Sequence, residues 1–171
     1  MKSERPVVAV SACLLGQKVR YDGTDKRNET ILGALAGQMD YRPFCPEVGI
    51  GLSVPRAPLQ LVQQESGLHV LGVADRTWNV TESLHAYGRE MALRWRGVCG
   101  VIFKCRSPSC GLTSVPLYDY SGELLGTATG AFAEEIATAL PELPMVEEEA
   151  LVDQRQYDSF IHRVMARHAT R

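Results

Sequence analysis

Cys13, Cys45 and Cys110 are the residues whose type and spacing could do metal chemistry. They are 32 and 65 residues apart, so they form no C-x-x-C pair and do not resemble a zinc finger or ribbon. Thiolates are characteristic ligands of iron-sulfur clusters, and a fully ligated 4Fe-4S cluster takes four of them. Three cysteines would therefore leave one iron open.

The remaining cysteines suit other readings. A single cysteine in a cytosolic protein is more often a small buried hydrophobe than a ligand, and Cys99, inside an apolar strand-like run, fits that description. Cys105 lies five residues before Cys110. It has three readings: a fourth ligand, a spare thiol near the site, or strand packing. We favour the last two.

Polar groups accompany each of the first three cysteines. The motifs Ser11-Ala12-Cys13, Cys45-Pro46-Glu47 and Ser107-Pro108-Ser109-Cys110-Gly111 put a hydroxyl or a carboxylate within three residues of a thiol. This mixture of thiol, hydroxyl and carboxylate favours catalysis over a purely structural role.

Length and composition predict an ordinary globular protein. The 171 residues, 45% of them hydrophobic and 22% charged, fit a single domain over 1–171. A formal charge of −2 provides no basic field for a polymeric nucleic acid. The sequence shows neither a signal-peptide core nor an apolar run of membrane-spanning length, so we expect a cytoplasmic protein with no membrane partner. An odd count of five cysteines argues against a disulfide framework.

Alternating strand-like and helix-like segments must position these residues. Apolar runs of β-branched residues predict strands, and spaced apolar residues predict helices. The predicted strands are Pro6–Ala12, Tyr41–Phe44, Val98–Lys104 and Met145–Val146, with hairpin arms at Leu68–Val73 and Val115–Tyr118. The predicted helices are Asn28–Gln38, Thr81–Arg96, Ala131–Leu140 and Leu151–His168. This order predicts an α/β fold of three layers, Rossmann-like, with a largely parallel sheet covered by helices on both faces.

The three cysteines each come after a predicted strand. In parallel sheets, ligands bind in the crevice at the carboxyl ends of the strands. We therefore expect Cys13, Cys45 and Cys110 to meet there.

At these motifs the sequence resembles the thiouracil desulfidase family of small bacterial proteins. The matching stretches run in one order along most of the chain, up to about Leu140: Ser11-Ala12-Cys13-Leu14-Leu15-Gly16, Val19-Arg20-Tyr21-Asp22-Gly23, Cys45-Pro46-Glu47, Val54-Pro55-Arg56-Ala57-Pro58 and Ser107-Pro108-Ser109-Cys110-Gly111. Their joint occurrence is far more specific than any one motif alone.

The resemblance implies a cofactor and a reaction. The cofactor is a 4Fe-4S cluster on Cys13, Cys45 and Cys110, with one open iron for the substrate sulfur. The reaction is a non-redox, hydrolytic desulfuration of a thiolated uracil or its nucleotide, such as 4-thiouridine 5'-monophosphate, which releases a uracil product and hydrogen sulfide. Carried over by motif, Glu47 is the catalytic carboxylate and Ser107 the catalytic serine, with Ser109 as the alternative.

Cations near the motifs could bind a nucleotide phosphate. Arg20, Arg56 and Lys104 are the candidates, because arginine suits bidentate contact with phosphate. Arg20 could instead pair with Asp22, and Arg56 could cap a turn. Tyr21 could stack on a pyrimidine ring or pack under its loop.

Two other functions compete with the desulfidase. One is a cysteine hydrolase or transferase with Cys110 as nucleophile and Ser109 or backbone amides as the oxyanion site. The other is a non-catalytic module that binds a cluster or metal. The four histidines lie outside the motifs, and the acidic run 147–149 is typical of a solvated face or a first helical turn. Oligomeric state is not readable from the sequence.

Overall fold

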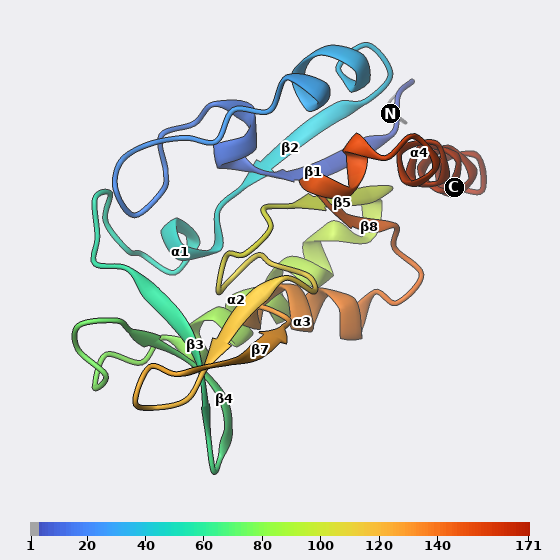
Figure 1. Ribbon diagram of the computed structural model, residues 1–171. Coiled ribbons are helices and arrows are strands. Elements are labelled where there is room, and N and C mark those ends of the chain that lie inside the picture. Colours follow the sequence, from blue (N-terminus) through green and yellow to red (C-terminus); the bar gives the residue numbers. More distant parts are fainter. Residues whose placement is uncertain (1–3) are drawn as a thin grey trace.

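Two four-stranded sheets organise the computed structural model, which describes residues 4–171 (Figure 1). The first sheet has the order β2-β1-β5-β8, and every neighbouring pair in it is parallel. Its strands are β1 (Val7–Ser11), β2 (Asp40–Phe44), β5 (Gly100–Phe103) and β8 (Met145–Glu147). The central strands β1 and β5 are apolar along nearly their whole length because both of their faces are covered.

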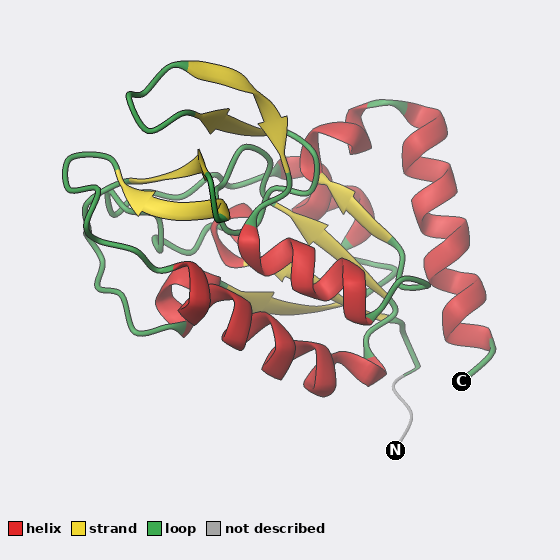
Figure 2. Ribbon diagram, turned by 90° about the horizontal axis from the view of Figure 1, so that it is seen from below, coloured by secondary structure: helices red, strands yellow, loops and turns green. Residues whose placement is uncertain are grey.

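Helices cover both faces of this sheet (Figure 2). On one face, Val8 and Val10 pack in a cluster with α4 (Gln154–Ala169) and the short π-helix η2 (Ile31–Leu35). On the other, Ala9 and Val101 pack with α2 (Thr81–Arg94) and α3 (Ala131–Ala139). Successive strand residues point to opposite faces, so each strand contributes to both clusters. The predicted α/β class with a covered parallel sheet is confirmed.

The two helices on the second face pack closely. A Cβ added to Gly88 of α2 would lie 2.7 Å from Cβ of Glu135 in α3. Glycine therefore permits a contact that a larger residue would block. The helix predicted over Thr81–Arg96 contributes to the core, because Leu84 and Trp95 are fully buried. The helix itself ends earlier than predicted and continues as the 3-10 turn η3 (Trp95–Gly97).

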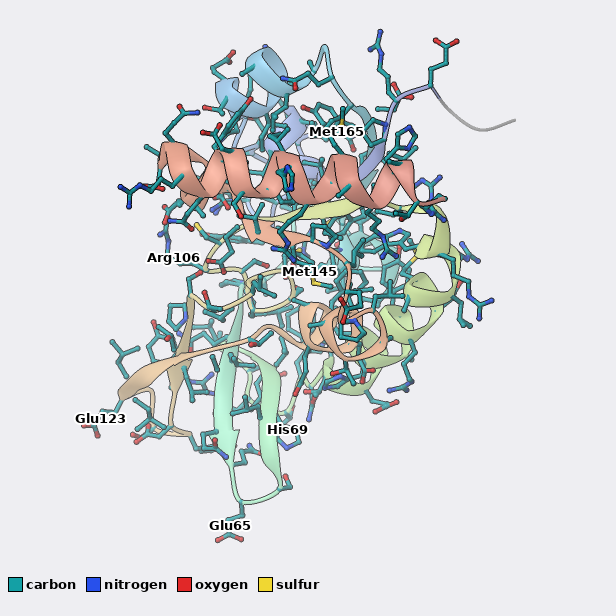
Figure 3. All side chains as sticks on the ribbon, turned by 90° about the vertical axis from the view of Figure 1, so that its right-hand side faces the viewer. Glu65, His69, Arg106, Glu123, Met145 and Met165 are labelled. Carbon is teal, nitrogen blue, oxygen red and sulfur yellow. The ribbon has the colours of Figure 1, made fainter. Side chains whose placement is uncertain are left out.

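A second, mixed sheet extends the expected architecture. Its order is β4-β3-β6-β7, built from the antiparallel pairs β3 (Leu59–Gln64) with β4 (Gly67–Gly72) and β6 (Val115–Tyr118) with β7 (Leu124–Ala128). Parallel pairing of β3 with β6 joins the two hairpins. Figure 3 shows Glu65 and Glu123 at the outer tips of these hairpins. The arms at β4 and β6 match the predicted ones, whereas β3 was not predicted.

The helix predicted over 28–38 is shorter than expected. Oδ1 of Asn28 accepts a hydrogen bond of 3.1 Å from the amide of Ile31, as an N-terminal cap does. Regular structure then ends at Leu35, before Gly37. The other short elements are η1 (Ala12–Leu15), α1 (Pro46–Gly49) and η4 (Glu148–Val152). Among the described residues, every helix is too short or too polar to cross a membrane.

Candidate active site

A cavity of about 520 Å³ opens at the carboxyl ends of β1, β2 and β5, between the two sheets. Its size falls in the range of small-molecule sites. Every candidate site residue predicted from the sequence lines it: Cys13, Arg20, Tyr21, Cys45, Glu47, Arg56, Lys104, Ser107, Ser109 and Cys110. The strand ends thus bring together residues that are far apart in the chain.

Each of the three cysteines follows a strand of the parallel sheet, but the local backbone differs between them. Cys13 lies in η1 directly after β1, where Gly16 closes the turn with φ of 87°. Cys45 comes after β2 in an extended conformation, and Pro46 begins α1 directly after it. Cys110 lies in the loop after β5. None is in a disulfide, and Cys13 and Cys110 are 7% and 6% exposed.

These thiols are held in a setting that opposes their ionisation. Burial raises the pKa of Cys13 to about 11, although the charge of Lys104 pulls it down. Burial also raises the pKa of Cys45. Burial is the main cause that raises the pKa of Cys110 well above its ordinary value, and the nearby Cys45 is the second cause. A set of mutually close, desolvated thiols ionises only if a positive centre compensates it.

The donor set fits an iron-sulfur cluster. Within residues 4–171, no group of three or more histidine, cysteine, aspartate and glutamate side chains has the geometry to hold one metal ion. A cluster spreads its thiolate ligands because each one binds a different iron. Three soft donors around one cavity therefore match a cluster, and Cys13, Cys45 and Cys110 would hold it.

The loop from Ser107 to Gly111 is built on the start of α3. Oγ of Ser107 accepts hydrogen bonds from the amides of Ser109 (3.3 Å) and Cys110 (3.1 Å). The amide of Ala133 donates to the carbonyl of Ser109 at 3.1 Å. A Cβ on Gly130 would lie 2.7 Å from that same carbonyl group, so glycine is needed for the close approach. Ser107 thus shapes the loop that carries Cys110.

Glu47 is the acidic group of the cavity and lies in α1. Its Oε1 accepts a hydrogen bond of 2.7 Å from the hydroxyl of Ser109, a fully buried residue. Its Oε2 accepts one of 2.7 Å from Nε of Arg56. Of the two serines left open by the sequence, Ser109 is the one that contacts the carboxylate.

Arg56 is engaged within the protein. Besides its ion pair with Glu47, its guanidinium donates to the carbonyls of Val19 (2.9 Å) and Ser53 (3.2 Å), and its side chain is 6% exposed. Both groups of the ion pair are nearly buried, so each depends on the other to compensate its charge. Phosphate binding by Arg56 stays a prediction, and its contacts in this structure are those of a partner of Glu47.

Lys104 is engaged in a second network. Its Nζ donates to Oε1 of Glu148 at 2.5 Å and to Sγ of Cys105 at 3.0 Å. Burial would lower the pKa of Lys104, but the hydrogen bonds to Glu148 and Cys105 outweigh it and raise that pKa. As with Arg56, phosphate binding by Lys104 stays a prediction.

Of the two alternatives for the acidic run 147–149, the first helical turn is correct for Glu148 and Glu149, which begin η4, whereas Glu147 ends β8. A fully solvated face is not what the structure shows. Glu148 is 6% exposed and binds Lys104 and Cys105. Oε1 of Glu147 accepts hydrogen bonds from three successive amides of the loop at 112–114. Glu149 forms a two-point ion pair with Arg106 on the surface. The pairing of β5 with β8 brings these acids beside the cysteine loop, which no local sequence signal reveals.

Arg20 and Tyr21 form the wall of the cavity on the first loop. The guanidinium of Arg20 lies 5.7 Å from the ring centre of Tyr21 and donates to Oγ1 of Thr24 at 3.4 Å. Asp22, the alternative partner of Arg20, accepts hydrogen bonds from Thr24. Lys26 also lines the cavity and was missed, because only the path of this loop brings it there.

Comparisons with known proteins identify the family of this chain. The family model described as 2-thiouracil desulfurase matches residues 8–149. A search of curated proteins found no match. Among solved structures, the [4Fe-4S]-dependent thiouracil desulfidase TudS is similar at 32% identity with a TM-score of 0.62, over 86% of this chain and 93% of that one. The chain therefore belongs to the 2-thiouracil desulfurase family of enzymes.

Proposed function

We propose that this protein removes sulfur from a thiolated uracil by hydrolysis, with a 4Fe-4S cluster held by Cys13, Cys45 and Cys110. The observation that carries the proposal is a single cavity lined by three thiols, of which Cys13 and Cys110 are buried, and by the Glu47–Ser109 pair. The similar solved structure is named as a cluster-dependent enzyme of this kind, which supports the same cofactor here. The five free cysteines fit a reducing, cytoplasmic setting.

The chemistry divides between the cofactor and the chain. When bound, the cluster would supply an open iron, a soft Lewis acid suited to the substrate sulfur. Glu47 acts as general base and takes a proton from the water that attacks the ring carbon. The carbon gains an oxygen and loses its sulfur as hydrogen sulfide, so the reaction consumes one water and moves no net electrons.

Ser109 completes the proton path. Its hydroxyl donates to Oε1 of Glu47 in the resting site, so the two can exchange a proton without moving the backbone. Arg56 holds the other carboxylate oxygen and keeps Glu47 aimed at the cavity. In this proposal Ser107 has a structural role, because its Oγ accepts hydrogen bonds from two loop amides.

A nucleotide such as 4-thiouridine 5'-monophosphate is the substrate we propose. Arg20 supplies a guanidinium at the cavity wall, and the Tyr21 ring beside it suits stacking on a pyrimidine. Lys26 adds a second cation to the same wall. Arg56 and Lys104 contribute less to phosphate binding because internal carboxylates already pair with both.

The alternative of a nucleophilic Cys110 has less support. A reactive cysteine needs a lowered pKa, whereas burial and nearby thiols raise the pKa of Cys110 well above its ordinary value. None of the four histidines, all within residues 4–171, lines the cavity to serve as a base. A non-catalytic module would leave the hydrogen-bonded Glu47–Ser109 pair in the cavity without a function.

The test is sulfide release by protein reconstituted anaerobically with iron and sulfide. We expect release from 4-thiouridine 5'-monophosphate by the wild type and none from Cys110→Ser, which loses the cluster. Cys99→Ala is the matched control, because Cys99 is equally buried but does not line the cavity. If the protein binds the cluster but releases no sulfide from this nucleotide or from free thiouracils, the proposed substrate is wrong. Protein that binds no cluster would disprove the cofactor.

A further inference from the structure

A fourth cysteine lines the proposed cluster cavity. Cys105 is 2% exposed and belongs to the same cavity wall as Cys13, Cys45 and Cys110. A 4Fe-4S cluster can take four cysteine ligands. If one iron is to stay open for substrate, the chain must keep this sulfur from binding it.

Glu148 clamps Cys105 at two points. Its Oε2 accepts a hydrogen bond of 2.6 Å from the amide of Cys105, and its Oε1 accepts one of 3.1 Å from the thiol. Nζ of Lys104 donates to the same sulfur at 3.0 Å. The thiol of Cys105 therefore donates one hydrogen bond and accepts another within the protein. The backbone of Cys105 cannot shift without breaking the hydrogen bond from its amide to Glu148.

Burial and the hydrogen bond to Glu148 favour the thiol of Cys105 over the thiolate, and only the thiolate binds a metal. Burial raises the pKa of Cys105 to about 12, with Glu148 acting in the same direction against Lys104. The ammonium of Lys104 lies closer to Oε1 of Glu148, at 2.5 Å, than to the sulfur, at 3.0 Å, so the carboxylate shares this donor with Cys105. A hydrogen bond to a carboxylate also holds the proton on sulfur directly.

The pairing of β8 with β5 places Glu148 beside Cys105. β8 pairs with β5 in the register Phe103 to Glu147, so the residue after β8 lies beside the residues after β5. Neither Glu148 nor Cys105 has a part in the proton path of Glu47 and Ser109. The clamp is thus a separate device on the same cavity.

We propose that Glu148 is a positioning residue that holds Cys105 as a thiol and so keeps it from becoming the fourth ligand of the cluster. The proposal rests on the proposed function, since it presupposes a cluster in this cavity. Its consequence is an open iron maintained by a carboxylate that touches neither substrate nor cluster.

The test measures how readily the cluster loses its open iron. Mild oxidation expels an iron that lacks a cysteine ligand and leaves a three-iron cluster with a distinct paramagnetic resonance signal. We expect this signal from the wild type and from Cys105→Ala. In Glu148→Gln, Cys105 is released to ligate the iron, so the signal is lost while the cluster is retained. The double variant Glu148→Gln/Cys105→Ala restores it.

Several outcomes would overturn the proposal. One is a Glu148→Gln protein with the same signal as the wild type, and another is a loss that Cys105→Ala does not restore. If Glu148→Gln does not fold, the comparison of wild type with Cys105→Ala can still overturn the proposal. A signal gained only on removing Cys105 would mean that this cysteine already ligates the cluster. A wild type that gives the signal but releases no sulfide from thiouracils would overturn the proposed reaction alone.

Discussion

Oε1 of Glu47 accepts a hydrogen bond of 2.7 Å from the hydroxyl of Ser109. The two residues are separated by 62 positions and come from α1 and the loop after β5. A carboxylate with a buried hydroxyl partner and a guanidinium on its second oxygen has a fixed orientation. This arrangement suits a general base whose proton can pass to a neighbour.

Glu47→Gln should lower turnover while sparing the cluster. The amide keeps the shape of the side chain but cannot take a proton, and general base catalysis typically contributes about 10²- to 10⁴-fold. Sulfide release and the visible absorbance of the cluster, measured on one preparation, separate the two effects. Glu65→Gln, at a hairpin tip far from the cavity, is the matched control. Undiminished turnover in Glu47→Gln would remove this residue from the reaction.

The two serines of the cysteine loop should respond differently to alanine. Ser109→Ala removes the partner of Glu47, so we expect a loss of turnover in a protein that retains its cluster. Ser107→Ala leaves the amides of Ser109 and Cys110 without their acceptor. An unsatisfied donor costs about 1–3 kcal/mol, so this variant should unfold at lower urea and hold the cluster less well. Cluster loss in Ser109→Ala with full activity in Ser107→Ala would contradict this assignment.

Alkaline pH should weaken the fold through Cys105. Its folded pKa of about 12 lies above its ordinary value of 9.0. The thiol therefore contributes its full stability below pH 9, and this contribution falls as pH rises from 9 towards 12, by at most about 1.4 kcal/mol per pH unit. The raised pKa of Lys104 acts in the same sense at pH above 10.5.

Urea unfolding of the cluster-free protein at pH 8 and pH 10.5 measures this dependence. We expect the free energy of unfolding to fall more in the wild type than in Cys105→Ala, which lacks the titrating thiol. Equal losses in the two proteins would show that other groups carry the alkaline effect.

Much of the site can be predicted from local sequence because apolar runs in the sequence show where the buried strands end. Apolar runs before Cys13 and Cys110 mark the buried strands β1 and β5, and the carboxyl ends of parallel strands lie at one edge of the sheet. That Cys13, Cys45 and Cys110 line one cavity is the outcome this pattern predicts. Their binding of a cluster is a prediction still to be tested in this chain.

Which charged side chains pair with one another could not be predicted from the sequence. An acidic run such as 147–149 has the composition of a solvated surface, and only the pairing of β8 with β5 buries Glu148 against Lys104. Arg56 likewise looks free for a phosphate until the fold puts Glu47 beside it. β3 escaped prediction because its Leu-Gln-Leu-Val-Gln-Gln sequence alternates poorly and comes after a stretch rich in proline and glycine.

Arg20→Ala should discriminate between a nucleotide and a free base. Arg20 lines the cavity beside the Tyr21 ring, and its side-chain hydrogen bond to Thr24 is long at 3.4 Å. A charge-assisted hydrogen bond is worth about 1.5–3 kcal/mol, so losing it should raise KM for 4-thiouridine 5'-monophosphate roughly 10- to 100-fold. KM for free 4-thiouracil should not change, since the base has no phosphate to lose. Arg42→Ala, an exposed position on β2 outside the cavity, is the matched control. If Arg20→Ala raises KM for both substrates equally, Arg20 acts on the pyrimidine or on the loop, and the phosphate must bind elsewhere.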